Sequence, residues 1–593
     1  MNIIKFPVIV CFIVAFAQVQ IFGQKEGDTW VLGYYSLGDP NWSIMHLNFT
    51  GNQLKIEWHF EETMQMSETA SNVCDEQGEA ILWTNGMEIF GKHGISISDT
   101  IAFVNDPLGY WNWFYTEEYG PLGFPEFGGA LILPVPDVLN QYSVIYHLAE
   151  LSPEFTFEIS KYYEARIELR EDSIFDLLYM DSLIGIEHDY FSGPIVATKH
   201  ANGRDWWISG FESNGTQYFV YLLDSSGIKL VRQDKLDAIV KDGLGMAAFS
   251  GQGNFIAKMD AITLNEGQYI NLFSFDRCDG IVTRLETFHT EAGYFTGVAF
   301  SPNERFLYAD DNTHLWQWDL WADNISASQT LVDTFDGFIQ PGWFAMDFGP
   351  LISAPDGRIY VVPSAGSSEY MHVIERPDLP ANECRFKQHS VNLTVPNART
   401  APNIPNYRLG PLDGSPCDTL GIDNIPVARW RFEEDQPGWR YDIRFTDLSF
   451  FDPQHWHWDF GDGSTSEEIH PVHSFENGLY HVCLTVSNEN GTDSTCQWVE
   501  ILPTSLEDGL TNHVSDLSID PNPFTDRLEI RSKMGTIRTA SLEIFDTNGS
   551  LVINQPKAPV PVTLYLPQVP PGMYLFRIRD NDGTLYNFKV MKI

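Results

Sequence analysis

A strand pattern that recurs about every 50 residues constrains the fold of this 593-residue chain more than any other feature. Each unit has a strand, a tight turn with Gly or Pro-Asn, a second strand, a loop, and a third strand that ends on an acidic turn. The corresponding positions Trp206, Phe255, Phe306 and Ile359 are separated by 49, 51 and 53 residues. This period is too long for leucine-rich repeats and is close to the ~40–50 residues of a four-stranded propeller blade.

Weaker copies of the unit lie upstream, at 78–91 and 141–148, and a further set of strands lies near 30–60. Together the copies predict an all-β chain that begins with a six- or seven-bladed β-propeller over 24–420. Blades that stack around an axis bury a continuous apolar core and leave few free strand edges. The first strands, near Trp30, are expected to complete the last blade, near 393–409. An elongated array of β-sandwiches is the alternative.

The composition limits the partners of this fold. The chain has 36 Lys and Arg against 80 Asp and Glu, a formal net charge of -44, and 43% hydrophobic residues. So many apolar residues are enough for folded cores, and the acids therefore cover folded surfaces. A negative field repels phosphate backbones and anionic lipid headgroups, which excludes nucleic acid as a partner.

The first 23 residues have the pattern of a secretory signal peptide. Lys5 provides a positive start, residues 6–16 are apolar, and Ala15 and Ala17 form a small-residue cleavage site. A membrane anchor is the competing interpretation, but the apolar stretch is short against the ~20 residues that a spanning helix needs. We find no other hydrophobic run of that length, so we expect no transmembrane segment in the mature chain.

A Pro-rich boundary at 401–417 separates the propeller from a segment of different character, 426–502. The segment contains Trp458-Asp-Phe-Gly-Asp-Gly463, followed by His-Ser-Phe, Gly-Leu-Tyr and Val-Cys-Leu-Thr-Val blocks at 473–475, 478–480 and 482–486. In this order the blocks closely resemble a PKD domain. The resemblance implies an immunoglobulin-like sandwich of ~80–100 residues.

After a linker at 503–514, the last segment, 515–593, contains three further blocks. They resemble the C-terminal type A sorting domain of Bacteroidetes type IX secretion cargo, which implies a small β-sandwich. The motif residues are Pro521, Asn522, Pro523, Gly549, Pro571, Gly572 and Tyr574. The resemblance implies that the type IX secretion machinery is a partner, and that the protein passes through the periplasm to the outer cell surface or is released.

Export would place the cysteines in an oxidising compartment. Without Cys11 of the leader, six cysteines remain, and six allow 15 connectivities. Geometry bears on one pair: if 489–490 is a two-residue hairpin loop, Cys483 lies directly opposite Cys496. If 490–491 is the loop, the two cysteines are diagonal neighbours on one face. Either register permits a disulfide. We also predict a Cys384–Cys417 disulfide, and Cys74–Cys278 follows by elimination.

Aromatic residues are the best candidates for ligand contacts. Trp111, Trp113 and Tyr115 lie in a loop flanked by acids and Gly/Pro turns, where they could stack on sugar rings or hold a peptide. The competing interpretation is that large aromatics fill the space between neighbouring blades.

Trp206 and a later group at 316–321 could likewise either contact a ligand or pack between blades. Trp316 and Trp318 share one face of a strand, which fits packing in a core better than exposure to a ligand. Trp321 is grouped with them because it follows closely in sequence.

The Trp458–Gly463 motif raises the question of calcium. Asp459 and Asp462 could provide oxygen ligands for Ca²⁺ at an acidic extracellular site, which makes Ca²⁺ the one cofactor to consider. An EF-hand loop is absent, however, and the motif also has the composition of a turn in which Gly461 and Gly463 adopt positive φ.

The sequence contains no nucleophile motif such as GxSxG where a strand leads into a helix. We therefore expect no catalytic residue, and a surface binding or adhesion protein whose propeller presents a ligand-binding face to an extracellular polysaccharide or protein. The alternative is a secreted hydrolase or lyase on a propeller scaffold, directed at a polysaccharide or a peptide. A third hypothesis gives the propeller only a structural role in a surface layer.

Overall fold

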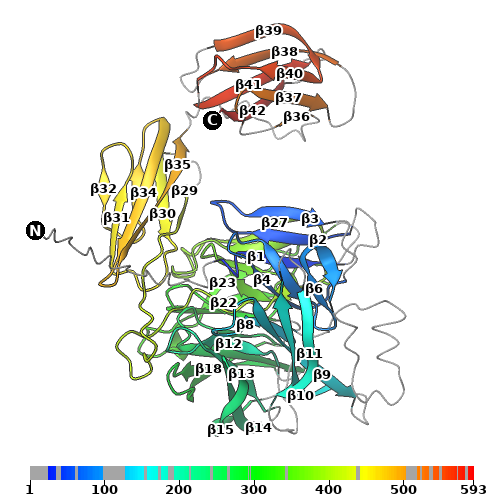
Figure 1. The fold of residues 1–593 in the computed structure, drawn as a ribbon, viewed down its shortest axis with the longest axis vertical. Coiled ribbons are helices and arrows are strands. Elements are labelled where there is room, and N and C mark those ends of the chain that lie inside the picture. Colours follow the sequence, from blue (N-terminus) through cyan, green and yellow to red (C-terminus); the bar gives the residue numbers. More distant parts are fainter. Residues whose placement is uncertain are drawn as a thin grey trace, which may run out of the picture. The chain divides into compact units, whose positions relative to one another are not determined.

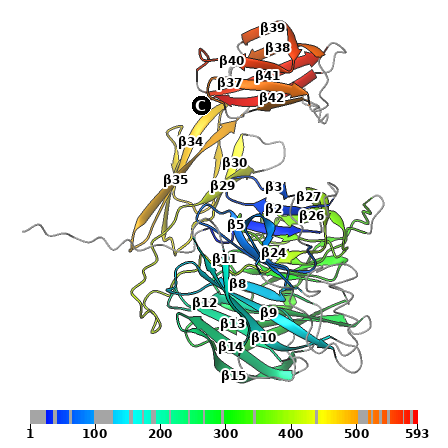
Figure 2. The ribbon, with the colours of Figure 1, turned by 45° about the vertical axis from the view of Figure 1, so that its right-hand side comes forward.

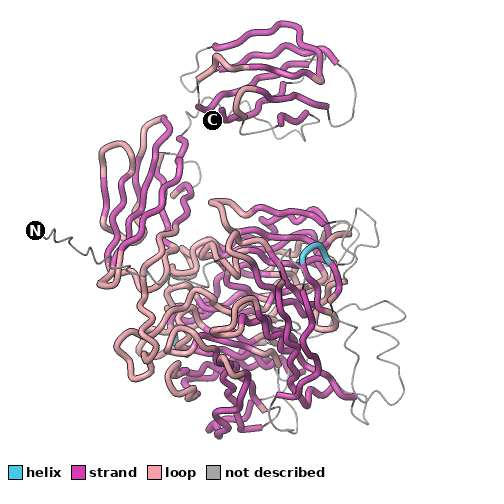
Figure 3. Tube along the Cα trace, in the orientation of Figure 1, coloured by secondary structure: helices cyan, strands magenta, loops and turns pink. Residues whose placement is uncertain are grey.

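The structure is a computed structural model that describes most of the chain. The described residues are 25–34, 42–59, 65–97, 127–151, 157–170, 175–184, 193–212, 215–240, 245–263, 267–291, 293, 296–340, 345–435, 441–501, 517–520, 524–532, 538–545, 551–570, 572–580 and 585–592. The expected leader, 1–23, lies outside them. Strands make up nearly all of the regular structure (Figure 3), and the described residues contain no α-helix.

The chain divides into two compact units. One contains residues 1–426 with the short stretches 450–452 and 488–491, and the other contains the remaining residues to 593. Within the first unit the described residues form seven sheets, antiparallel except for one pair of strands and coloured blue to yellow-green in Figure 1. An all-β architecture with a repeated four-stranded unit is therefore confirmed, and the blade number is seven.

The strands of the seven blades follow chain order except at one place. The first three blades contain β1 (Thr29–Gly33), β2 (Ile44–Asn48), β3 (Lys55–His59); β28 (Ala401–Pro402), β4 (Thr69–Cys74), β5 (Ala80–Thr84), β6 (Ile89–Gly91), β7 (Ile95–Ser96); and β8 (Ala130–Pro134), β9 (Gln141–Leu151), β10 (Phe157–Leu169), β11 (Phe175–Ile184). A short 3-10 turn, η1 (Lys92–Gly94), lies between β6 and β7.

The other four blades each have four consecutive strands, and Figure 2 shows the first of them, residues 196–240, with its four strands labelled. They are β12 (Val196–Lys199), β13 (Trp206–Phe211), β14 (Gly215–Asp224), β15 (Gly227–Val240); β16 (Ala247–Phe249), β17 (Phe255–Thr263), β18 (Gly267–Phe275), β19 (Val282–Thr290); β20 (Val298–Phe300), β21 (Phe306–Asp310), β22 (His314–Asp319), β23 (Thr330–Thr334); and β24 (Leu351–Ser353), β25 (Ile359–Val361), β26 (Ser368–Ile374), β27 (Phe386–Asn397). A 3-10 turn, η4 (Ser326–Ser328), precedes β23.

The repeat seen in the sequence matches these blades residue by residue. Trp206, Phe255, Phe306 and Ile359 are the first residues of β13, β17, β21 and β25, the second strand of each blade. Large side chains recur here because this position faces the neighbouring blade, and Trp206, Phe306 and Ile359 are buried. The period of the sequence is thus the period of the blade.

The propeller closes through strands from both ends of the segment. Residues 397–402 run between β1 and β4: Asn397 Oδ1 accepts from Gly33 N (3.2 Å), and Ala398 N donates to Gly33 O (2.8 Å). On the other side β28 pairs in parallel with β4. The strands near Trp30 form a three-stranded sheet of their own, and the end of the segment pairs with β4 of the next blade. The expectation that they complete the last blade is therefore wrong, because β24–β27 already supply four strands to that blade.

Beyond β28, residues 403–412 cross the inner strands, and we call them the channel segment. Asn403 Nδ2 donates to Ala130 O (3.1 Å) and to Ile195 O (2.7 Å), so it joins the starts of two blades. Tyr407 is buried, and its hydroxyl donates to Ile132 O (2.8 Å). The channel segment thus runs along the first strands, from their starts at Asn403 to the turns between first and second strands, where Leu412 N donates to Ala201 O (2.9 Å).

The cysteine pairing differs from the prediction outside the hairpin. The structure joins Cys278 to Cys417, with a Cα–Cα distance of 5.6 Å, and leaves Cys74 and Cys384 as buried thiols. The predicted Cys384–Cys417 and Cys74–Cys278 pairs are therefore wrong. The reason is the route of the chain after the channel segment: Arg277 Nη2 donates to Gly410 O (2.6 Å), which holds the chain leading to Cys417 beside Cys278.

In the second unit, residues 427–501 form a sandwich of two sheets. One sheet has β29 (Trp430–Glu434), β30 (Asp442–Asp447) and β33 (Val472–Ser474); the other has β32 (Thr465–Ser466), β31 (His455–Asp459), β34 (Gly478–Ser487) and β35 (Thr492–Ile501). Trp430 and Trp458 meet edge to face in its core, with ring centroids 5.5 Å apart. Alternation along β31 puts Trp458 inside and Asp459 outside.

The β34–β35 hairpin settles the two registers that the sequence left open. Asn488 N donates to Gly491 O (3.0 Å), so residues 489–490 form a two-residue turn. Counting outward from this turn, Cys483 pairs directly with Cys496. The predicted disulfide between them is present, with a Cα–Cα distance of 4.1 Å.

The C-terminal residues form a second small sandwich, drawn in orange and red in Figure 1. Its sheets are β36 (Leu517–Asp520), β37 (Arg527–Ser532), β40 (Val562–Tyr565) and β39 (Leu551–Val560), β38 (Arg538–Phe545), β41 (Gly572–Asp580), β42 (Leu585–Lys592). Apolar residues that alternate along these strands, Phe576 and Ile578 among them, form its core.

Candidate functional site

An exposed tryptophan marks one loop of the propeller as a candidate binding site. Trp318, at the end of β22, is buried, and Trp316 is half-buried with its indole N–H donated to Asp311 Oδ2 (3.0 Å). Trp321, three residues after Trp318, is 66% exposed. The interpretation of packing is therefore correct for Trp316 and Trp318 and wrong for Trp321, because β22 ends at Asp319 and Trp321 lies in the following turn.

A short turn holds the backbone of Trp321. Asp319 Oδ1 accepts from Trp321 N (3.0 Å), and Ala322 N donates to Asp319 O (3.2 Å). Ser328 Oγ accepts from Asp319 N (2.8 Å) on the other side of the turn. The backbone that carries the exposed ring is thus held by bonds to Asp319 and its neighbours, rather than by burial.

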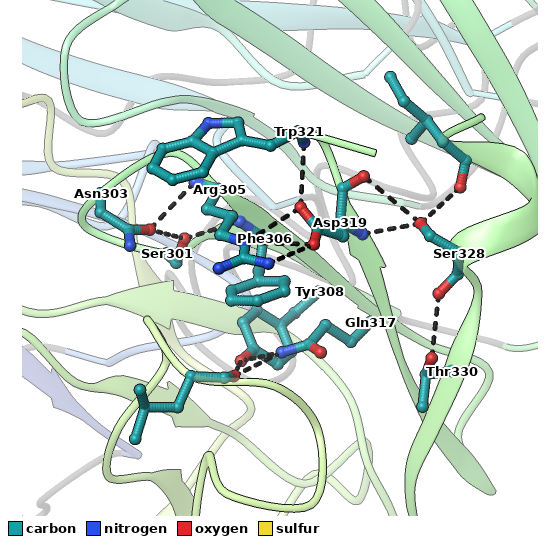
Figure 4. Close-up of polar contacts among 12 residues, drawn as sticks. Ser301, Asn303, Arg305, Phe306, Tyr308, Gln317, Asp319, Trp321, Ser328 and Thr330 are labelled. Carbon is teal, nitrogen blue, oxygen red and sulfur yellow. Dashed lines mark hydrogen bonds and ion pairs between the residues drawn. The ribbon is translucent and has the colours of Figure 1, made fainter. Parts of the chain in front are cut away.

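Arg305 supports the indole from below (Figure 4). Its guanidinium carbon lies 5.3 Å from the centre of the Trp321 ring and 4.9 Å from that of Phe306. Its Nε and Nη2 donate to Asp319, the latter over 2.7 Å. These bonds lower the pKa of Asp319, so the carboxylate stays charged and the planar pair stays formed. Cation–π contact and ion pair together hold Trp321 in one orientation.

Two donors at this site have no partner within the described part of the chain. Arg305 Nη1 makes no hydrogen bond there. Asn303 accepts from Arg305 N (3.0 Å) and Ser301 Oγ (2.8 Å) through Oδ1, while its Nδ2 is unused. Asn303 belongs to the β20–β21 turn, which Asp378 Oδ1 holds by accepting from Asn303 N (2.9 Å). We call Asn303, Arg305, Asp319 and Trp321 the Trp321 site.

The sequence carried a signal for this site. Turn-forming residues follow Trp321 directly, as Ala-Asp-Asn at 322–324, which indicates that the strand has already ended. Nothing in the sequence indicates that Arg305 belongs to the site, because its partner Asp319 is 14 residues away on the adjacent strand. The expected ligand contacts Trp111, Trp113 and Tyr115 lie outside the described residues.

At the other end of the β20–β23 blade, the carboxylates of Asp310 and Asp311 accept hydrogen bonds from backbone N–H groups. Asp310 is fully buried and accepts from Gly297 N (2.8 Å) and Asn312 N (2.9 Å), and burial raises its pKa well above the ordinary value. Asp311 accepts from His314 N (2.8 Å). Carboxylates bonded in this way shape loops.

The two proposed calcium ligands also have partners. Asp459 Oδ1 accepts from Gly461 N (2.9 Å) and Asp462 Oδ1 from Ser464 N (2.8 Å), while Asp462 Oδ2 lies 2.8 Å from His473 Nε2. Gly461 and Gly463 have φ of 76° and 95°, as expected of the turn. Each carboxylate thus has a role in the turn.

Two of the sorting-motif residues are described. Gly572 has a φ of 151° at the start of β41, and Tyr574 is buried with its hydroxyl donated to Pro570 O (2.7 Å). This bond ties β41 to the Pro-Pro segment before it. Pro521, Asn522, Pro523, Gly549 and Pro571 lie outside the described residues.

Two parts of the chain match known domain families. Residues 425–502 match the PKD domain, and residues 518–592 match the secretion system C-terminal sorting domain. The chain therefore carries a PKD domain and a type IX sorting domain, which directs export to the cell surface or the extracellular space and implies contact with the secretion machinery. The part of the chain that the structure describes contains no apolar helix of the length needed to span a bilayer. No curated protein matches the chain.

Solved structures similar to parts of the chain include the PKD1 domain of the Vibrio cholerae metalloprotease PrtV, at 28% identity over 13% of this chain and 96% of that chain, with a TM-score of 0.12. Others are a putative 6-phosphogluconolactonase from Bacteroides uniformis (13% identity, 63% and 98% covered, TM-score 0.38) and a periplasmic gluconolactonase from Pseudomonas aeruginosa (13% identity, 62% and 97% covered, TM-score 0.32).

Proposed function

We propose that this chain is an exported binding protein whose propeller holds an extracellular ligand at the Trp321 site. We further propose that residues 1–23 are a cleaved leader, that 24–420 form the propeller, and that 426–502 and 515–593 form the PKD and sorting domains. The observation that supports binding is the exposed indole of Trp321, fixed by Arg305 and Asp319. A large aromatic ring gains free energy when a ligand covers it, and one already held in place loses little entropy on binding.

Three buried acids of the propeller, Asp260, Asp310 and Asp311, support a binder over a hydrolase. A hydrolase needs an acid and a base that face a reacting atom. Asp310 and Asp311 instead accept hydrogen bonds from loop N–H groups, and Asp260 is paired with Lys258 (2.5 Å) with both side chains fully buried. These three carboxylates are used to hold strands and loops within their own blades.

An array of extracellular proteins and polysaccharides, probed with the full chain, tests the proposal. We expect at least one immobilised ligand to bind wild type and to lose binding to Trp321→Ala. The matched control is Trp498→Ala, which removes an indole that is 57% exposed on β35, in a different domain. If Trp321→Ala retains every interaction of the wild-type protein, the Trp321 site is not the binding site.

A further inference from the structure

We infer that the ligand of the Trp321 site is a neutral polysaccharide, whose sugar ring stacks on the indole while its hydroxyl groups bond to the polar rim. This inference rests on the proposed function and specifies its ligand. A pyranose ring presents one face of C–H groups and an edge of hydroxyls. The site presents the matching surfaces: one flat aromatic ring with hydrogen-bonding side chains around it.

The ring of Trp321 can accept such a partner without rearrangement. Arg305 occupies its supported side, at 5.3 Å from the ring centre, and 66% of the residue remains exposed. Dispersion between flat apolar surfaces depends on close contact over the whole face, which a fixed indole provides. A sugar ring covers an area similar to that of an indole, so one ring fills the platform.

The rim provides the hydrogen bonds that sugar hydroxyls require. Arg305 Nη1 and Asn303 Nδ2 are unused donors within the described residues, and the Asp319 carboxylate, to which Arg305 donates through its other nitrogens, is an acceptor beside them. A hydroxyl group both donates and accepts, so it can bond a donor and an acceptor of this rim together. Bidentate contacts of this kind give orientation as well as affinity.

The charge of the site favours a neutral sugar over an acidic one. The Arg305 charge is already neutralised by Asp319, and Asp378 lies behind Asn303. The chain as a whole has a net charge of -44. Within the four residues of the Trp321 site the one cation, Arg305, is already paired, so a uronic acid polymer would meet this negative field without a counter-charge from them and would be repelled.

The surroundings also favour a sugar over a protein. A protein partner needs a contiguous apolar patch with a polar rim. Here the residues that follow the indole, Asp323 and Asn324, are exposed and polar, and the residues beside it are Arg305 and Asn303. One aromatic ring surrounded by polar side chains suits a sugar, which has an apolar C–H face and hydroxyl groups at its edge.

Affinity electrophoresis with the full chain in native gels tests the inference. The probes are soluble β-glucan, mannan and galactan as neutral polymers, polygalacturonate as the acidic polymer, and gelatin as a protein. We expect retardation by at least one neutral polymer. Trp321→Ala should weaken it about tenfold or more, and Trp321→Phe, which keeps an aromatic face, less than Trp321→Ala. Arg305→Met removes the donors and should weaken binding as well, while Trp498→Ala should leave it unchanged.

The outcomes separate the ligand class from the binding function. If only polygalacturonate or only gelatin binds, and Trp321→Ala abolishes that binding, the neutral polysaccharide is wrong and the proposed function stands. If a neutral polymer binds equally to wild type and to Trp321→Ala, both fail for this site. If no neutral polymer binds, the inference is wrong whatever the array finds. A thermal unfolding transition shared by all variants verifies that each one is folded.

Discussion

At the scale of single residues, His372 shows how the propeller holds a titratable group without charge. It lies fully buried on β26, and its Nδ1 accepts from His389 N (3.0 Å). Burial lowers the pKa of His372 to about 3, with a further contribution from the charge of His389. The imidazole thus stays neutral in the folded protein between about pH 6.5 and about pH 3, where a free histidine is protonated.

This pKa has a consequence for acid stability. The unfolded chain binds a proton at His372 below about pH 6.5 and the folded chain does not until about pH 3, so the free energy of unfolding falls as the pH falls between these values. The slope is about 1.4 kcal/mol per pH unit when one proton is involved. We expect His372→Gln to reduce this acid slope, measured by urea unfolding from pH 7 to pH 4. Equal slopes in the two proteins would contradict the assignment.

Asn403 offers a second test at the residue scale. It donates two hydrogen bonds, to Ala130 O and Ile195 O, and these carbonyls lose their partner in Asn403→Ala. We expect a loss of about 2–3 kcal/mol in the free energy of unfolding of the propeller. The matched control is Asn406→Ala in the same segment, whose exposed amide donates to Gly251 O and which should cost less than 1 kcal/mol, roughly a surface hydrogen bond. Urea unfolding of both variants gives the comparison.

At the scale of elements, local pairing could be predicted and distant pairing could not. The Cys483–Cys496 disulfide follows from counting along one hairpin, because a two-residue turn fixes every pair above it. Cys278 and Cys417 are 139 residues apart in sequence, and they meet only because the channel segment runs over one end of the propeller. The sequence does not show the path of the channel segment, so pairing the remaining four cysteines by elimination gave the wrong disulfides.

The hairpin disulfide should contribute measurably to the PKD domain. Its cysteines are 13 residues apart, and closing a loop of about this length in the unfolded chain is worth ~3 kcal/mol in the chain-entropy account. We expect the double variant Cys483→Ala/Cys496→Ala to lower the midpoint of the PKD transition in scanning calorimetry. The transition of the C-terminal sandwich should not move. A PKD transition identical to that of wild type would show that the loop is already ordered in the unfolded state.

At the scale of the whole molecule, the sequence predicted the propeller but not its blade number. The period places the second strand of four blades to the residue, because apolar side chains must recur wherever one blade meets the next. The count depends on how 397–402 and β1 come together, and the Gly33–Asn397 bond spans 364 residues. No local pattern encodes that contact. The Trp321 site likewise could not be predicted from the sequence, since Arg305 bonds to Asp319 on the adjacent strand, 14 residues away.

The sorting domain gives a prediction for the whole chain. Removing residues 503–593 should stop the protein from reaching the cell surface or the medium, because the matched sorting domain is lost. The propeller should unfold at the temperature seen in the full chain, since its core is built from residues before 410. Immunoblots of cell fractions measure the first effect, and calorimetry the second. Surface display of the truncated chain would refute the assignment of the sorting domain.

The closure of the propeller by 397–402 also sets an order of events during synthesis. The chain is made from its N-terminus, so β1 and β4 leave the ribosome more than 300 residues before residues 397–402, which bond to Gly33 and pair with β4. Until then β1 and β4 each present an open edge able to bond to another chain. A propeller stalled at this stage would be a template for aggregation until residues 397–402 had covered both edges.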